Sequence, residues 1–157
     1  MARSPPDSRS GPQSGPSLGS PAGKAPDGAL CASEKKSLAE RGVVVLVEND
    51  GALASALRFA LEIEGWAVLF FASGEALLGG PLPAARFCVV CNQRLPGVSG
   101  IEALQEMRRR GIAAPAILLT GDPSPAQRRA AAKVRARLVE KPLLDSELLD
   151  AVRDALA

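Results

Sequence analysis

The chain has 157 residues, of which 46% are hydrophobic and 23% are charged, so it suits one globular domain with some chain left outside it. It contains no histidine, which excludes Ser-His-Asp catalysis, histidine-ligated metal sites and phosphohistidine relay steps. A net charge of +2 and only 3% aromatic residues argue against nucleic acid or an acidic membrane surface as a ligand.

The three cysteines are an odd number and do not make a disulfide framework, so we expect a reducing, cytoplasmic setting. No apolar run is as long as a membrane span, and residues 1–20 lack the apolar core of a signal peptide. Cys88 and Cys91 have CxxC spacing, but residues three apart in a strand point to opposite faces. We therefore interpret both thiols as core filling.

Residues 1–41 are rich in residues that favour open chain. Gly, Pro and Ser occupy 17 of the first 30 positions, and large aliphatic side chains are scarce. Such a segment buries too little apolar surface to offset the entropy lost on ordering it. We predict a disordered tail over residues 1–41 and one folded domain over residues 42–157. The role of the tail stays open between a passive tether, a misassigned start codon and a binding arm.

The sequence pattern in the first part of the folded domain predicts two strands and two helices. Val43–Val47 is a continuous apolar run, as expected of a strand covered on both faces. A helical period with one apolar face follows, and Gly65 ends that helix. Residues 66–71 predict the second strand, and Ser73 is placed to cap a short helix after it.

The second part predicts three more strands, over residues 87–91, 116–120 and 136–139. Two of the intervening helices open with the spacing of a capping box. The boxes are Ser99 with Glu102 and Ser124 with Gln127, and Asp145 is the predicted cap of a last helix. This alternation predicts an α/β fold with a single doubly wound, five-stranded parallel sheet and helices on both faces. In such sheets, ligand sites lie beyond the carboxyl ends of the strands.

Polar residues follow the predicted strands at that edge. They are Glu48, Asn49 and Asp50 after the first strand, Asn92 after the third, Thr120 at the end of the fourth and Lys141 after the fifth. Oxygen ligands beside a lysine ammonium would suit phosphate and magnesium chemistry.

These residues and the segments around them resemble the receiver domain of bacterial two-component response regulators. The segments that carry the resemblance are residues 44–50, 61–68, 94–100, 118–121 and 139–143. The resemblance covers residues 42–157 and implies a flavodoxin-like receiver fold. It also implies that Glu48 matches the first acid of a magnesium site, and that Thr120 and Lys141 match the groups that contact a phosphoryl group.

Two positions depart from that family. The second acid is Asn49, and the aspartate that would accept the phosphoryl group is Asn92. An amide has no anionic oxygen to attack phosphorus, so Asn92 cannot form an acyl phosphate. One carboxylate among amides predicts weak or lost Mg²⁺ binding, and no other metal or cofactor is expected. The side chain of Asp50 is expected to point elsewhere, but an active phosphoacceptor receiver that uses Asp50 is the alternative.

Basic residues gather around the fourth predicted helix and the fifth strand, where receivers form dimers and dock partners. This basic face comprises Arg128, Arg129, Lys133, Arg135 and Arg137, with Leu138 where the family usually carries an aromatic. Because no aromatics are interleaved, we interpret it as a docking face for an acidic protein surface. The helix itself offers mostly alanine, so we expect it to be marginally anchored. Arg108–Arg110 end the preceding helix, where cations interact favourably with the helix dipole.

The sequence therefore predicts a stand-alone, degenerate receiver that is not an enzyme. It would act in two-component or phosphorelay signalling as a phosphorylation-independent protein-interaction module. The expected partner is a signalling protein (a histidine kinase, a regulator or another receiver), without nucleic acid or membrane, and a homodimer is left open. A broken paralogue with no partner is a further rival.

Overall fold

The structure is a computed structural model and describes residues 41–143 and 146–157. The predicted disordered tail therefore lies outside the described residues except for Arg41, and the domain boundary at residue 42 stays a prediction. Asp145, the predicted cap of the last helix, also lies outside them. None of the described helices has both the length and the apolar character that crossing a membrane would require.

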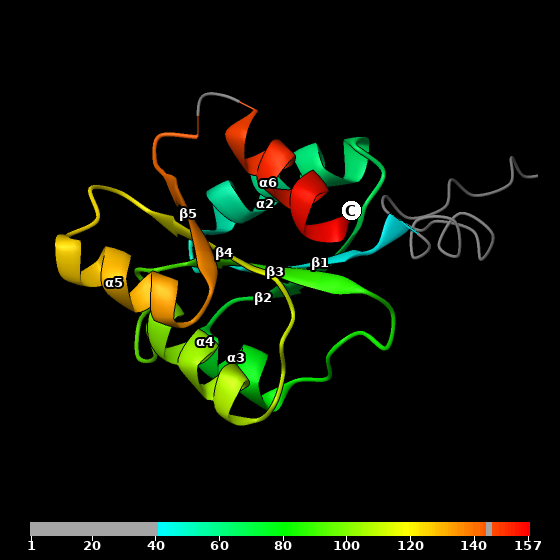
Figure 1. Ribbon diagram of the computed structural model, residues 1–157. Coiled ribbons are helices and arrows are strands. Elements are labelled where there is room, and N and C mark those ends of the chain that lie inside the picture. The colour runs from blue at the N-terminus through cyan, green and yellow to red at the C-terminus, as the bar shows by residue number, and fades with distance from the viewer. Residues whose placement is uncertain (1–40, 144–145) are drawn as a thin grey trace, which may run out of the picture. The chain divides into compact units, whose positions relative to one another are not determined.

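Five parallel strands form one sheet in the order β2-β1-β3-β4-β5 (Figure 1). The strands are β1 Val43–Val47, β2 Ala67–Phe71, β3 Phe87–Asn92, β4 Ala116–Thr120 and β5 Ala136–Glu140. The predicted doubly wound parallel sheet is thus confirmed. Because strand pairing does not stop where the apolar run stops, β3 and β5 extend one residue further than predicted, to Asn92 and Glu140. Trp66 lies before β2 rather than in it, and its N–H donates to the Leu61 carbonyl oxygen at the end of a helix.

Helices cover both faces of the sheet (Figure 1). They are α2 Gly51–Ile63, α3 Gly74–Gly79, α4 Gly100–Arg109, α5 Pro125–Lys133 and α6 Glu147–Leu156. Apolar side chains of α2 and α6 pack on one face of the sheet, and those of α3, α4 and α5 pack on the other. Cys88 belongs to the first of these clusters and Cys91 to the second, so the predicted placement of the two thiols on opposite faces is confirmed.

The helix starts follow the capping chemistry of the sequence. Ser73 accepts from the Ala76 N–H at the start of α3, and both predicted capping boxes form at the starts of α4 and α5. Ser146 stands at the N-cap position of α6 and makes no side-chain cap bond. The caps of α3, α4 and α5 satisfy backbone N–H groups that have no partner within their own helix. They also set the points at which the loops of the carboxyl edge turn into helices.

Candidate functional site

The candidate site lies at the carboxyl edge of the sheet, where β1, β3, β4 and β5 end side by side. Glu48, Asn92 and Thr120 are only 1%, 6% and 5% exposed, although all three are polar or charged. Lys141 reaches them from the loop after β5, and its backbone N–H donates to the Thr120 carbonyl oxygen at 2.8 Å. The parallel topology thus brings residues from four segments into one small polar region.

Glu48 is a buried carboxylate held mainly through one of its oxygens. Its Oε1 accepts from the backbone N–H groups of Asn49 at 3.0 Å and Asp50 at 3.1 Å, and from Asn92 Nδ2 at 3.0 Å. Its Oε2 is buried without a hydrogen bond and lies 3.9 Å from Lys141 Nζ. Since a buried carboxylate is costly unless it is paired and hydrogen-bonded, these donors and the ammonium together offset the cost of burying Glu48.

Asn92 joins the anion and the cation of the site. Its Nδ2 donates to Glu48 Oε1 and, at 3.1 Å, to the Arg94 carbonyl oxygen. Its Oδ1 accepts from Lys141 Nζ at 3.2 Å. The Asn49 amide fits with its nitrogen toward Glu48 Oε1 and the Arg94 carbonyl oxygen, each at 3.1 Å. An ionised carboxylate in this place could accept from the ammonium but could not donate to Glu48, so this bridge requires a side chain with both a donor and an acceptor, as the asparagine amide has.

These residues do not fit a hard divalent cation. Mg²⁺ needs several oxygen ligands in near-octahedral geometry, but here Asn92 turns its N–H₂ toward Glu48 and its oxygen toward Lys141. The oxygen of Glu48 without a hydrogen bond faces the Lys141 ammonium. In the part of the chain that the structure describes, no three acidic, histidine or cysteine side chains gather as metal ligands would.

Thr120 lies in the same region but is held differently. Its hydroxyl makes one long hydrogen bond, 3.5 Å to the Gly121 carbonyl oxygen, and no other among the described residues. It stands at the end of β4, paired with Glu140 of β5. The side chain therefore contributes little to the Glu48–Asn92–Lys141 bridge, although its backbone carbonyl holds Lys141.

Asp50 points away from this bridge, as the sequence predicts. Its side chain is the N-cap of α2, where Oδ1 accepts from the Ala52 N–H at 3.0 Å and the Leu53 N–H at 3.1 Å. We did not predict this role, but the signal was present, because aspartate directly before a helical period is a favoured N-cap.

The residues of the basic face lie in three different surroundings. Arg128 on α5 pairs with Glu140, and Arg137 on β5 pairs with Asp154 on α6. Arg135 lies in the turn before β5, near Arg108 of α4. The surroundings differ because these residues come from α5, from the turn before β5 and from β5 itself, where successive side chains point to opposite faces of the sheet. The remaining members are Arg129 and Lys133, which are exposed, and Leu138, which is partly buried against the core on the α4 side.

Cys88 and Cys91 are both buried, and Cys91 Sγ donates to the Asn92 carbonyl oxygen at 3.5 Å. Burial raises the pKa of each thiol to about 12, and the nearby Glu48 carboxylate adds to the rise at Cys91. Both thiols therefore stay protonated at neutral pH and are poor nucleophiles.

Comparison with known proteins identifies one family for this chain. The family model of the response regulator receiver domain matches residues 44–153, and the chain belongs to this family. The transcriptional regulatory protein FixJ of Azorhizobium caulinodans is 36% identical over 114 residues, which are 72% of this chain and 54% of that protein. Nodulation protein W of Bradyrhizobium diazoefficiens is 34% identical over 113 residues, 71% of this chain and 50% of that protein. The chain thus spans about half the length of these relatives.

Solved structures agree with the family match. The crystal structure of FixJ-N superposes with a TM-score of 0.67 at 27% identity, covering 73% of this chain and 93% of that one. Response regulator StyR gives the same TM-score at 29% identity, covering 73% of this chain and 59% of that one. The receiver-type, flavodoxin-like fold predicted from the sequence is therefore confirmed, and the domain belongs to two-component signalling.

Proposed function

We propose that this receiver domain is degenerate and acts as a protein-interaction module whose binding does not depend on aspartyl phosphorylation. The observation that carries the proposal is the bridge in which Asn92 donates to Glu48 and accepts from Lys141. The Asn92 amide links the Glu48 carboxylate to the Lys141 ammonium within the protein itself. The two opposite charges therefore balance each other without a phosphoryl group or a metal ion.

Phosphoryl transfer at this position requires a carboxylate oxygen that attacks phosphorus while the bond to the donor's leaving group breaks. The Asn92 side chain is neutral, and its one oxygen already accepts from Lys141 and, at 3.4 Å, from the Arg94 N–H. A neutral amide oxygen is a poor nucleophile, so this step has no acceptor at Asn92. Mg²⁺ would have to displace Lys141 and turn Asn92 around before it found ligands, so we propose that its binding is weak or lost.

Asp50 is a poor substitute acceptor. Its Oδ1 caps α2 through two backbone N–H groups, and loss of a helix cap typically costs about 1 kcal/mol. Phosphorylation of Asp50 would also have to occur without support from Lys141, which bonds to Asn92. The geometry therefore favours the degenerate receiver over the active one.

Output would then pass through protein contact, and we infer a signalling protein of the two-component class as the partner. The exposed cations of α5 suit an acidic surface on a histidine kinase, a regulator or another receiver. We propose a cytoplasmic location and no enzymatic activity for this domain, and neither nucleic acid nor a membrane as its ligand.

The test is to incubate the full chain with acetyl phosphate and Mg²⁺ and to weigh the product by mass spectrometry. The wild type should gain no phosphoryl group. The double variant Asn49→Asp, Asn92→Asp should gain one, because it restores the acceptor and the second acid. Asp50→Asn is the matched control and should behave as the wild type. A wild-type phosphoryl adduct that disappears in Asp50→Asn would establish the active alternative and overturn our proposal.

A further inference from the structure

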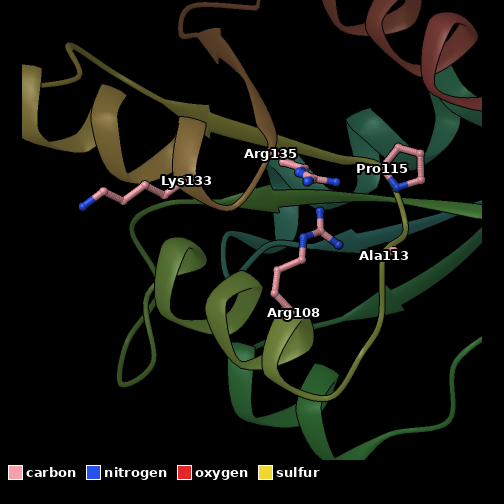
Figure 2. A pocket seen from close by; sticks show the side chains of 5 residues that line it. All are labelled: Arg108, Ala113, Pro115, Lys133 and Arg135. Atoms are coloured by element: carbon pink, nitrogen blue, oxygen red, sulfur yellow. The ribbon is translucent and has the colours of Figure 1, made fainter.

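A pocket lined by three cationic side chains lies at the opposite edge of the sheet, at the amino ends of β4 and β5. It has a volume of about 320 Å³ and is lined by Arg108, Ala113, Pro115, Lys133 and Arg135 (Figure 2). Pro115 directly precedes β4 and Arg135 directly precedes β5. The pocket is thus separated from the Asn92 region by the length of the strands and shares no residue with it.

Two guanidinium groups meet in this pocket. Figure 2 shows the Arg108 side chain rising from α4 and that of Arg135 coming from the turn after α5, with their guanidinium groups facing one another. The Lys133 ammonium points away from both. Partial burial and, next, the nearby Arg135 charge lower the pKa of Arg108. Arg135 is exposed, whereas Arg108 is half-buried, and an anion between the two like charges would relieve their repulsion.

Nothing in the lining neutralises this pair, because it contains no acidic residue. The neighbouring Arg109 and Arg110 both pair with Glu106. In residues 41–143 and 146–157, by contrast, neither Arg108 nor Arg135 forms an ion pair with a carboxylate. The described residues thus neutralise the two neighbouring arginines but neither guanidinium group of the pocket.

Arg108 is held in place yet keeps donors free. Its Nε donates to the Val134 carbonyl oxygen at 2.9 Å, and its Nη1 donates to the Ile112 carbonyl oxygen at 2.7 Å. A guanidinium has five N–H donors, so most of them stay available after these two bonds. The two carbonyls fix the plane of the group, and an anion would meet a preorganised donor.

Arg135 occupies a strained backbone position. Its φ is +56°, in the left-handed region that favours glycine. It follows the C-cap residue Val134 of α5, where glycine is the usual residue. An arginine there is costly in backbone conformation and adds a second charge beside Arg108. Strain of this kind at a charged position is an indication of function.

We propose that this pocket binds the phosphate group of a small-molecule ligand between the Arg108 and Arg135 guanidinium groups. Planar guanidinium forks match phosphate oxygens bidentately, and a dianion would neutralise both charges. The volume exceeds that of a single phosphate, so a diphosphate or a nucleoside diphosphate fits the space. The bound group would tie α4 to the turn after α5. This site is independent of the phosphorylation state of the carboxyl edge.

The test follows the arginine Nε–Hε NMR signals of the full chain during titration with pyrophosphate and, separately, with adenosine diphosphate, at constant ionic strength. Saturable shifts are expected at Arg108 and Arg135 and not at Arg109 or Arg128. Equal affinities would assign recognition to the phosphates alone, and tighter adenosine diphosphate binding would assign it to a nucleoside diphosphate. Shifts that sodium chloride reproduces would overturn the proposal, as would tighter binding of an Asp-rich peptide.

The decisive variant is Arg135→Gly, which removes one guanidinium and relieves the left-handed strain. It should fold with a melting temperature at least equal to that of the wild type and bind pyrophosphate about tenfold more weakly, as expected for loss of a charge-assisted contact. Arg109→Gln removes a cation at the same helix end and should change the affinity less than about twofold, as expected for an exposed, already paired charge. Wild-type affinity in Arg135→Gly would refute the site.

Discussion

Helices α4 and α5 follow neighbouring strands of the site and open in the same way, but the core holds them very differently. Each begins with a capping box made by a serine and a residue three positions later. Helix α4 buries Ile101, Ala103, Leu104 and Met107 against the sheet, whereas α5 buries Ala131 alone. Equal local signals therefore give unequal anchoring, because anchoring depends on the apolar area that each helix buries.

This difference in anchoring defines two parts of the molecule, a fixed part around α4 and a loosely held part around α5. A Cβ at Gly100 would lie 2.6 Å from the Asn92 carbonyl oxygen, so α4 approaches the site as closely as glycine allows. Gln93 Oε1 also accepts from the Ile101 N–H at 2.9 Å, which ties the loop after Asn92 to α4. Helix α5 instead exposes Arg128 and Arg129. Asn92 thus belongs to the fixed part, and the proposed docking surface belongs to the loosely held part.

The largest expected effect comes from the fixed part. Leu104→Ala removes a fully buried side chain from the contact of α4 with the sheet and should lower the free energy of unfolding by about 2–5 kcal/mol. Urea denaturation of the full chain measures it. Ala131→Gly on α5 is the comparison and should cost about 1 kcal/mol, mostly through helix propensity. Equal losses in the two variants would contradict the difference in anchoring.

The capping serines test the same difference at smaller scale. Ser99→Ala and Ser124→Ala each remove a hydrogen bond to the N–H three residues later, worth about 1 kcal/mol. Because α5 is expected to open locally, Ser124→Ala should speed amide exchange within α5 about fivefold without affecting α4. Ser99→Ala should instead lower the free energy of global unfolding. If both variants act only on global unfolding, α5 is as firmly held as α4.

The smallest effect is expected at the Arg128–Glu140 ion pair, whose side chains are 52% and 51% exposed. A double-mutant cycle with Arg128→Ala and Glu140→Ala should give a coupling of about 0–1 kcal/mol that disappears in high salt. The Arg58–Glu62 pair on α2 is a control of similar exposure. A coupling above this range would mean that α5 is fastened to β5 by charge rather than by its core contact.

The fold was predictable because it rests on local patterns. The apolar run Val43–Val47, the capping boxes and Gly65 each carry a signal that the tertiary structure reinforces. The approach of Glu48, Asn92 and Lys141 also follows from parallel topology, since strand ends share one edge.

Other features do not follow from local sequence patterns. The direction of the Asn92 amide, with its nitrogen toward Glu48, depends on side-chain geometry that spacing does not reveal. The meeting of Arg108 with Arg135 depends on how α4 packs beside the turn after α5, which local charge patterns cannot show. The ion pairs of Arg128 with Glu140 and of Arg137 with Asp154 likewise depend on how α5, β5 and α6 pack.

The most direct test of the central claim is an amide NMR titration of the full chain with Mg²⁺, followed by beryllofluoride. We predict that the resonances of Glu48, Asn92, Thr120 and Lys141 do not move, because the bridge through Asn92 leaves no ligand set for the metal and no carboxylate for the phosphoryl mimic. Saturable shifts at these residues that spread to α5 and Leu138 would contradict the account and show that the phosphorylation switch survives.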